Sequence, residues 1–209
     1  MLTSILAPVV DGAQQRGSRW IWLLAALHTL GNMVSAAAVG AVLSLAAVAL
    51  RARGHDSTVW GSWLAALIAL LYLPRQLGWT RLPRLLQSHC QVPREWAYDY
   101  PRWVTALLFG LGLGSGLYTR ILVPTFYLVL LWPFVSPGFT FGLLLWIAYG
   151  LARSLNVWLL ALTTPSGDPF PYAARFLKAL ARSATMMNRA HAMLLGVAAV
   201  WLLVAVGHV

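Results

Sequence analysis

The stretch from Pro101 to Gly138 constrains the fold most, because it is almost entirely apolar: PRWVTALLFGLGLGSGLYTRILVPTFYLVLLWPFVSPG. One straight α-helix of this length would extend for about 50 Å, whereas the hydrocarbon core of a bilayer is about 30 Å thick. Arg120 is the one cation between its two hydrophobic runs. We therefore expect this stretch to make two membrane passes, or one deeply broken pass, with Ser115 to Arg120 as the joint.

Composition indicates that lipid is the medium of this chain. Hydrophobic residues make up 60% of its 209 residues and charged residues 10%, and its mean hydropathy is +0.72. These values lie outside the soluble globular range. The net charge is +10, but the cations flank apolar runs, so anionic lipid and the positive-inside rule explain them better than nucleic acid does. We expect membrane lipid, and no nucleic acid, as a partner.

Apolar runs separated by polar or proline-rich connectors predict an all-α, polytopic transmembrane bundle of about six helices. We expect passes at about 28–50, 59–73, 103–118, 119–136, 139–162 and 190–206. The first follows an interfacial or bent start near Gly31. The second ends at Pro74, because proline lacks an amide hydrogen and disfavours helical geometry in the residue before it. Ala36, Gly40 and Ser44 recur four apart, a spacing that lets helix backbones approach closely in lipid.

The sequence predicts one transmembrane domain, 1–209, with two polar surface features. Residues 75–102 read as a polar interfacial loop with a short helix, since their prolines argue against one continuous helix. Residues 172–186 read as an amphipathic interfacial helix, because cations recur at helical spacing opposite apolar residues. In the connector before the second pass, Asp56 and Ser57 are candidate N-caps.

Short matching segments suggest two related halves. ALHTLG at 26–31 and LLFGLG at 107–112 open the two long apolar stretches, while LPRQLG at 73–78 and LARSLN at 151–156 end the helix after each. Such repeats are usual in transporter-like folds, so two inverted three-helix repeats are compatible with the sequence. Length favours six passes with a cytoplasmic N-terminus, whereas the positive-inside rule favours five.

Charged groups are scarce within the predicted passes. All five acids lie in connectors: Asp11, Asp56, Glu95, Asp99 and Asp168. Proton-coupled carriers generally need carboxylates within the membrane, so the sequence disfavours that class. A cation at the depth of Arg120 costs at least about 2.5 kcal/mol unless it snorkels or finds a partner. Arg120 is therefore either a structural anchor or part of a substrate or anion site, together with Thr119, Pro124 and Asn32.

Two histidines, His28 and His191, lie in or near the predicted passes. Two imidazoles that face one another could bind haem or a metal, and a single one could ligate a pigment. A lone histidine in an apolar helix more often hydrogen-bonds to a neighbouring backbone carbonyl. The sequence therefore leaves haem or pigment binding open as an alternative to no cofactor.

The glycines of the central stretch form two interleaved GxxxG pairs, Gly110 with Gly114 and Gly112 with Gly116. In an apolar helix this pattern indicates close packing or a hinge. No combination of nucleophile, base and orienting group stands out, and a histidine next to Cys90 is too little for zinc, which prefers four ligands. We therefore expect neither an enzyme nor a bound metal.

Three segments carry a family resemblance: LHTLG at 27–31, GLGLGSGLYTRI at 110–121 and AYGLARSLNVW at 148–158. In these the chain resembles the CcdA and DsbD transmembrane-domain family, and within it the cysteine-poor MauE-like proteins. TRILVP at 119–124 occupies the place of the family's T-P-C-x-x-P motif. Thr119 and Pro124 are kept, but Ile121 stands at the cysteine position, and NMVSA replaces the cysteine motif of the first half.

The resemblance implies six helices in two inverted triplets, with 119–136 as a broken helix near the centre. Members of the family pass reducing equivalents across the bilayer through two cysteines on two broken helices. A dithiol relay needs two sulfurs within reach of each other. Because this chain has one cysteine, Cys90, the resemblance does not carry that activity over.

Together these observations favour a non-catalytic, multi-pass protein of a bacterial-type inner membrane. We expect it to act as a subunit or scaffold of a larger membrane complex, with other membrane subunits as partners. One alternative is a small-solute or anion transporter that uses broken helices near Arg120. The other is a haem- or pigment-binding electron-transfer subunit.

Overall fold

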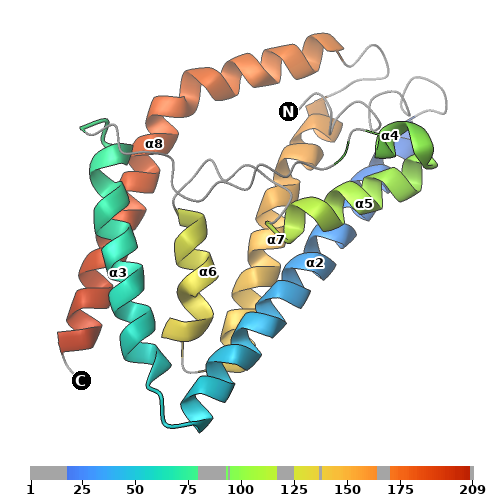
Figure 1. The fold of residues 1–209 in the computed structure, drawn as a ribbon. Helices are drawn as coiled ribbons and strands as arrows, with labels where there is room; N and C mark the ends of the chain where they lie inside the picture. The colour runs from blue at the N-terminus through green and yellow to red at the C-terminus, as the bar shows by residue number, and fades with distance from the viewer. Residues whose placement is uncertain are drawn as a thin grey trace. The chain divides into compact units, whose positions relative to one another are not determined.

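The computed structural model describes residues 18–79, 93, 95–116, 125–136, 138–163 and 170–207. The helices in these residues are α2 (Ser18–Ala52), α3 (Ser57–Gln76), α4 (Trp96–Asp99), α5 (Arg102–Gly114), α6 (Thr125–Val135), α7 (Phe139–Thr163) and α8 (Phe170–Gly207) (Figure 1). All except the four-residue α4 are eleven residues or longer, and the described residues contain no strand. The predicted all-α fold with about six helices is confirmed.

Four helices are long and apolar enough to cross a membrane, with candidate spans at Trp20–Ala52, Ser57–Gln76, Phe139–Leu159 and Thr185–Val204. The chain is therefore a multi-pass membrane protein. Within the described residues, helices α5 and α6 have 13 and 11 residues, so these parts extend for about 20 Å or less, which is shorter than a core of about 30 Å. Residues 117–124, which hold most of the predicted joint between them, lie outside the described residues, so the choice between five and six passes stays open.

The chain divides into two compact units. The first comprises residues 1–38, 88–120 and 147–182, and the second comprises residues 39–87, 121–146 and 183–209. The first therefore holds the start of α2, with α4, α5 and the end of α7. The second holds the end of α2, with α3, α6, the start of α7 and most of α8. Helices α2, α7 and α8 each contribute to both units.

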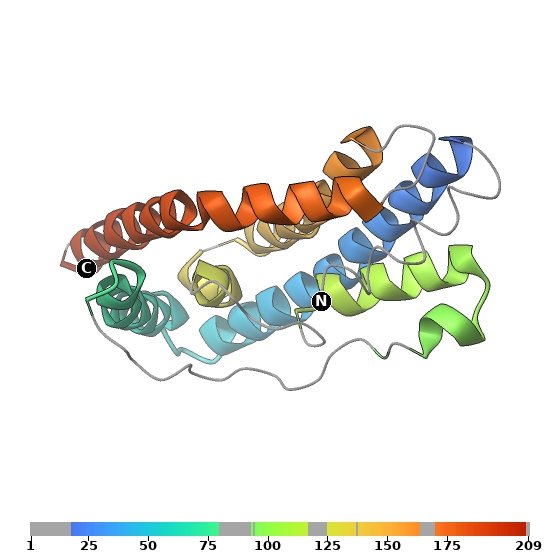
Figure 2. The same ribbon diagram turned by 90° about the horizontal axis from the view of Figure 1, so that it is seen from above.

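In the first unit, α5 and the end of α7 pack on the start of α2 (Figure 2). Ile21 and Leu24 of α2 form one buried cluster with Ala106 of α5 and Ala161 of α7. Helix α4 is tied to α5, because the Thr105 hydroxyl donates to the Trp96 carbonyl at 2.9 Å. This is the short helix expected within 75–102, although residues 80–92 and 94 of that loop lie outside the described residues.

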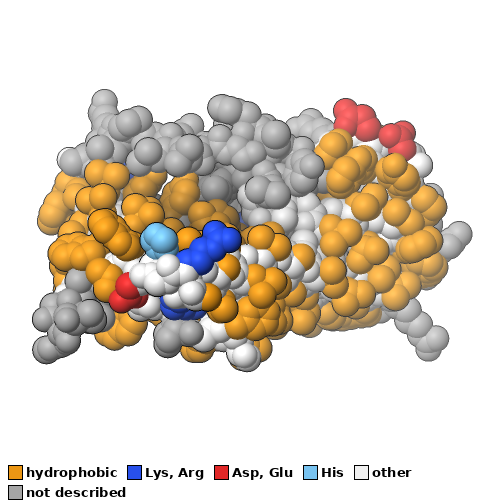
Figure 3. Space-filling view, turned by 60° about the horizontal axis from the view of Figure 1, so that its bottom comes forward, with side chains coloured by type: hydrophobic (Ala, Val, Ile, Leu, Met, Phe, Trp, Pro, Cys, Tyr) orange, Lys and Arg blue, Asp and Glu red, His pale blue; other side chains and the backbone are white. Residues whose placement is uncertain are grey.

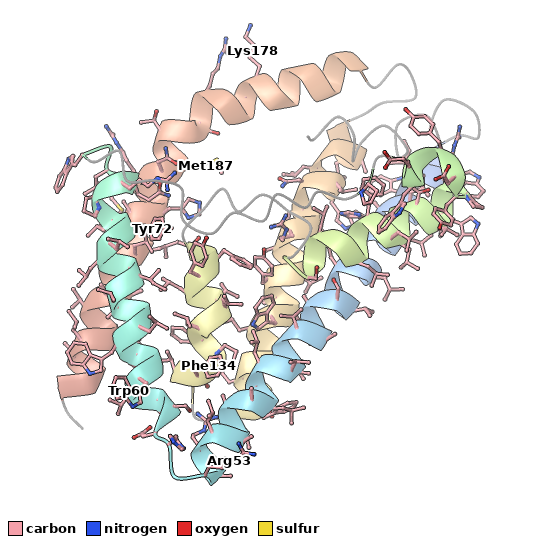
Figure 4. The ribbon with its side chains drawn as sticks, viewed as in Figure 1. Arg53, Trp60, Tyr72, Phe134, Lys178 and Met187 are labelled. Atoms are coloured by element: carbon pink, nitrogen blue, oxygen red, sulfur yellow. The ribbon has the colours of Figure 1, made fainter. Side chains whose placement is uncertain are left out.

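In the second unit, α6 packs against both α3 and α8. Ala65 and Ala66 of α3, Val135 of α6 and Leu202 of α8 form one buried cluster. The Trp132 ring of α6 stacks on Trp201 of α8, with centroids 5.6 Å apart. On the other side, Phe134 of α6 abuts Gly61 of α3, where a Cβ atom would lie 2.9 Å from the Phe134 Cβ (Figure 4).

The expected start of the first helix near residue 28 is wrong, because α2 begins at Ser18 and continues through Gly31 to Ala52 without a break. Gly31 lies against the backbone of α5, where a Cβ atom would overlap the Leu107 carbonyl oxygen. The glycine at this position therefore permits close packing. Its effect on helix propensity, about 1 kcal/mol relative to alanine, is too small to end a helix held on two sides.

The predicted end of the second helix at Pro74 is also wrong, since α3 continues to Gln76. A proline in the last turn removes only one intrahelical hydrogen bond, and the Leu77 amide still donates to the Leu73 carbonyl at 3.1 Å. The chain leaves the helix at Gly78, whose φ of 78° favours glycine. At the other end of α3, the Asp56 carboxylate accepts from the Thr58 amide at 3.0 Å, which confirms Asp56 as the N-cap.

The predicted surface helix, 172–186, and the last pass, 190–206, form one continuous helix, α8. The sequence between them, from Met187 to Arg189, contains no proline or glycine that would end a helix. Lys178 and Arg182 are exposed, and the candidate span begins only at Thr185. Whether residues 172–186 lie on a lipid surface stays a prediction.

The small residues spaced four apart on α2 lie against α7, as their spacing predicts. In the first unit, Ala36 faces Gly150, where a Cβ atom would lie 2.9 Å from the Ala36 Cβ. In the second unit, a Cβ atom at Gly40 would lie 2.5 Å from the Cβ of Trp146, and one at Gly142 would overlap the Ser44 hydroxyl. Small side chains thus replace the hydrophobic effect, which lipid cannot supply between helices.

We predict that Gly40→Ala destabilises the second unit by about 1–3 kcal/mol, because the added methyl group overlaps the fully buried Trp146. Thermal unfolding of the detergent-solubilised protein measures this. Gly138→Ala is the matched control, since no atom lies within 4 Å of the Cβ that it would add. Equal losses for the two variants would contradict this account of the α2–α7 contact.

Candidate functional site

The strongest candidate site is a buried face of α2 in the first unit. Four residues at positions i, i+3, i+4 and i+7 share this face: His28, Gly31, Asn32 and Ser35. His28 is 2% exposed and Asn32 is not exposed at all. A candidate membrane span contains all four, so their polar groups must find partners within the protein.

Glycines of α5 and α7 lie directly against backbone carbonyls of this face. A Cβ atom at Gly110 would overlap the His28 carbonyl oxygen, and one at Gly114 would overlap the Asn32 carbonyl oxygen. A Cβ atom at Gly150 of α7 would lie 2.7 Å from the same Asn32 oxygen. Only glycine permits these approaches, so they fix where α2, α5 and α7 cross.

The Asn32 side chain is half satisfied. Its Nδ2 donates to Ser154 Oγ of α7 at 3.1 Å and contacts the His28 carbonyl at 3.3 Å. Ser154 in turn donates to the Gly150 carbonyl at 3.1 Å. Asn32 Oδ1, by contrast, is buried without a hydrogen-bond partner, which costs about 1–3 kcal/mol. Because Asn32 is closed in by the three helices, a ligand could reach Oδ1 only if they moved apart.

The two histidines that the sequence singles out belong to different units. The His28 ring hydrogen-bonds to the backbone of Ala106 in α5, which is the structural role that is more common for a lone histidine. His191 lies in the second unit, where its Nδ1 is 3.5 Å from Thr125 Oγ1. Each histidine therefore has a partner within its own unit, and binding of haem or pigment stays a prediction.

Other predicted site residues are placed only in part. Thr119, Arg120, Pro124 and Cys90 lie outside the described residues. Gly112 is buried within α5, and Gly116 follows the Ser115 C-cap with a φ of 72°, a conformation that favours glycine. Among the described residues, no group of three His, Cys, Asp or Glu side chains could hold a metal ion.

Sequence reasoning missed the polar residues of α7 that complete the site. Besides Ser154, the Trp158 indole donates to Thr29 Oγ1 at 2.8 Å, and Arg153 donates to the Tyr149 hydroxyl at 2.8 Å. Gly150, Ser154 and Trp158 recur four apart, as Ala36, Gly40 and Ser44 do on α2. That periodicity would have identified the face of α7 that meets α2.

Comparison with known proteins gives a distant relationship. The chain is 32% identical over 155 residues to methylamine utilization protein MauF of Paracoccus versutus, covering 74% of this chain and 55% of that protein. It is 30% identical over 165 residues to MauF of Paracoccus denitrificans, covering 78% of this chain and 57% of that protein. The chain is similar to MauF over about three quarters of its length.

The relationship to MauF covers most of this chain, but the chain spans little more than half the length of these relatives. No family model matches the chain, and no solved structure matches it. The name of these relatives refers to methylamine utilization. The resemblance to the CcdA and DsbD family, and within it to the MauE-like proteins, stays a prediction.

We predict that Asn32→Asp destabilises the protein by about 2.5–3.5 kcal/mol, the cost of a carboxylate within a membrane span. Asn32→Leu should change stability by less than about 1.5 kcal/mol, because it removes the unpaired Oδ1 together with the donor. Thermal unfolding in detergent distinguishes these outcomes. Asn188→Asp is the control, since Asn188 is exposed on α8. A harmless Asn32→Asp would show that water reaches this face.

Proposed function

We propose that this chain is a non-catalytic membrane subunit that helps to assemble, or holds together, a membrane complex serving methylamine utilization. The crossing of α2, α5 and α7 carries the proposal. There, buried polar groups are used to join helices: His28 contacts Ala106, Asn32 contacts Ser154 and Thr29 contacts Trp158. An enzyme or carrier needs polar groups that a substrate can reach, whereas those of this crossing face one another.

The cysteine content supports a role without redox chemistry of the CcdA type. That chemistry uses two cysteines of one chain, which exchange disulfides with partner thiols, so it requires at least two thiols within the chain. The chain has one cysteine. We therefore assign it no dithiol relay of its own.

The outer faces of the helices suit lipid or another membrane protein. On α3, Trp60 is 75% exposed and Leu67 is 61% exposed, and on α8 Met193 and Val197 are 71% and 70% exposed. Figure 3 shows apolar side chains over much of the described surface on one face, with basic and acidic side chains near the α2–α3 turn and a second group of acidic side chains elsewhere on that face. Lipid contact follows from the membrane spans, and further membrane subunits are part of the proposal.

The link to methylamine rests on the similarity to MauF. We predict that deletion of the gene from its native host abolishes growth on methylamine as the only nitrogen source and leaves growth on ammonium unchanged. Gly114→Leu should fail to restore growth, because it separates α5 from Asn32. Gly138→Leu should restore it, because the space around Gly138 is open. Normal growth of the deletion strain on methylamine would reject the proposed process.

The subunit role has its own test. A tagged chain, extracted in mild detergent from cells grown on methylamine, should retain a second membrane protein in fixed ratio. The Gly114→Leu variant should lose it and Gly138→Leu should keep it. A chain that purifies alone and moves a solute into liposomes would instead identify a transporter.

A further inference from the structure

Two groups of contacting side chains lie toward one end of the helix bundle of the second unit: Tyr72 and Arg75 of α3 with Tyr127 of α6, and Thr125 of α6 with His191 of α8. We call these five residues the Arg75 cluster. Tyr72 is 4% exposed, and the other four are half-buried. The cluster therefore has both a fixed base and side chains that a ligand can reach.

Direct contacts join the members within each of the two groups. The Tyr72 and Tyr127 rings stack with centroids 5.8 Å apart, and their side chains hydrogen-bond to each other. The Arg75 guanidinium lies 5.9 Å from the Tyr72 ring centroid. Thr125 Oγ1 lies 3.5 Å from His191 Nδ1.

The packing of α3 on α8 places Arg75 and His191 at similar depth. Ala66 packs with Leu202, and Ala69 packs with Ala199, while Leu73 lies 4.0 Å from the Cβ that Gly196 would carry. Helices α3 and α8 are therefore antiparallel. Extending this antiparallel register brings Arg75 level with the turn of α8 that contains His191.

The cluster is positively charged without an acidic partner among the described residues of its unit. The one carboxylate there is Asp56, which caps the opposite end of α3, about 30 Å away along a helix of 20 residues. Figure 4 shows Tyr72 near one end of α3 and Arg53 near the opposite end of the unit. The Tyr72 ring makes a cation–π contact with Arg75, but an uncharged ring leaves the positive charge of the guanidinium in place.

We propose that the Arg75 cluster binds a phosphate group. The planar guanidinium of Arg75 offers two parallel N–H donors for phosphate oxygens, and the His191 ring can supply a further donor. Arg75 lies in the last turn of a candidate span that ends at Gln76, the depth of lipid headgroups. Leu71 and Met187, 41% and 44% exposed, offer apolar contacts near the cluster for acyl chains. The phosphate therefore comes from a phospholipid or from solution.

The test compares both sources on the purified full chain. Short-chain phosphatidic acid, short-chain phosphatidylcholine and inorganic phosphate are each titrated into the detergent-solubilised protein, and binding is followed by native mass spectrometry and by the shift in melting temperature. We expect Arg75→Gln to weaken phosphate binding about tenfold or more, as loss of a charge-assisted hydrogen bond does. Arg53→Gln is the matched control, because Arg53 is an exposed arginine of the same unit.

Each outcome has a definite meaning. Tight binding of phosphatidic acid alone identifies a lipid site, and equal binding of inorganic phosphate identifies a site for free phosphate. If Arg75→Gln does not fold, Arg75→Lys and His191→Gln replace it, and each should still weaken binding several-fold. Absence of binding, or equal weakening by Arg53→Gln, overturns the proposal. The site lies in the second unit, so this result is independent of the role proposed for the crossing in the first.

Discussion

The structure depends on contact between helix backbones without intervening side chains. In the first unit, the His28 and Asn32 carbonyls of α2 lie against Gly110, Gly114 and Gly150. At such distances Cα–H groups can contact carbonyl oxygens, and dispersion acts over the whole crossing. In lipid, where burying apolar surface gives little advantage, this contact is the main source of helix association. The glycines allow the helices to cross at this distance. The hydrogen bond from Asn32 to Ser154 then fixes the position of α2 along α7.

Several features followed from the sequence because they depend on short-range chemistry. Spacing identified the face of α2 that contains Ala36, Gly40 and Ser44, and the Asp56 cap followed from the side chain's ability to accept from a nearby amide. The errors arose where tertiary contacts outweighed local preference. Helix α2 continues through Gly31, against which α5 packs, and Pro74 does not end α3, because it lies in the last turn.

The candidate site was only half visible in the sequence. Asn32 stood out as a polar residue in an apolar run, but its partner Ser154 lies 122 positions away, and no local pattern joins the two. His28 and His191 suggested a shared cofactor because both lie in apolar helices, yet each is used within its own unit. The Arg75 cluster was missed for the same reason, since its members come from three helices.

Arg51 ties together segments that are distant in the chain. Its Nη1 donates to the Ser136 carbonyl at 2.8 Å, so the last turn of α2 holds the carbonyl end of α6, where a cation is favourable. A side chain of α2 thus holds the start of the short link from α6 to α7. Among homologous chains, insertions should be tolerated at Gly54, which has open space around it, whereas the α6–α7 link should keep its length. Loop lengths in homologous chains would then vary at the α2–α3 turn and stay constant at the α6–α7 link, which Arg51 holds.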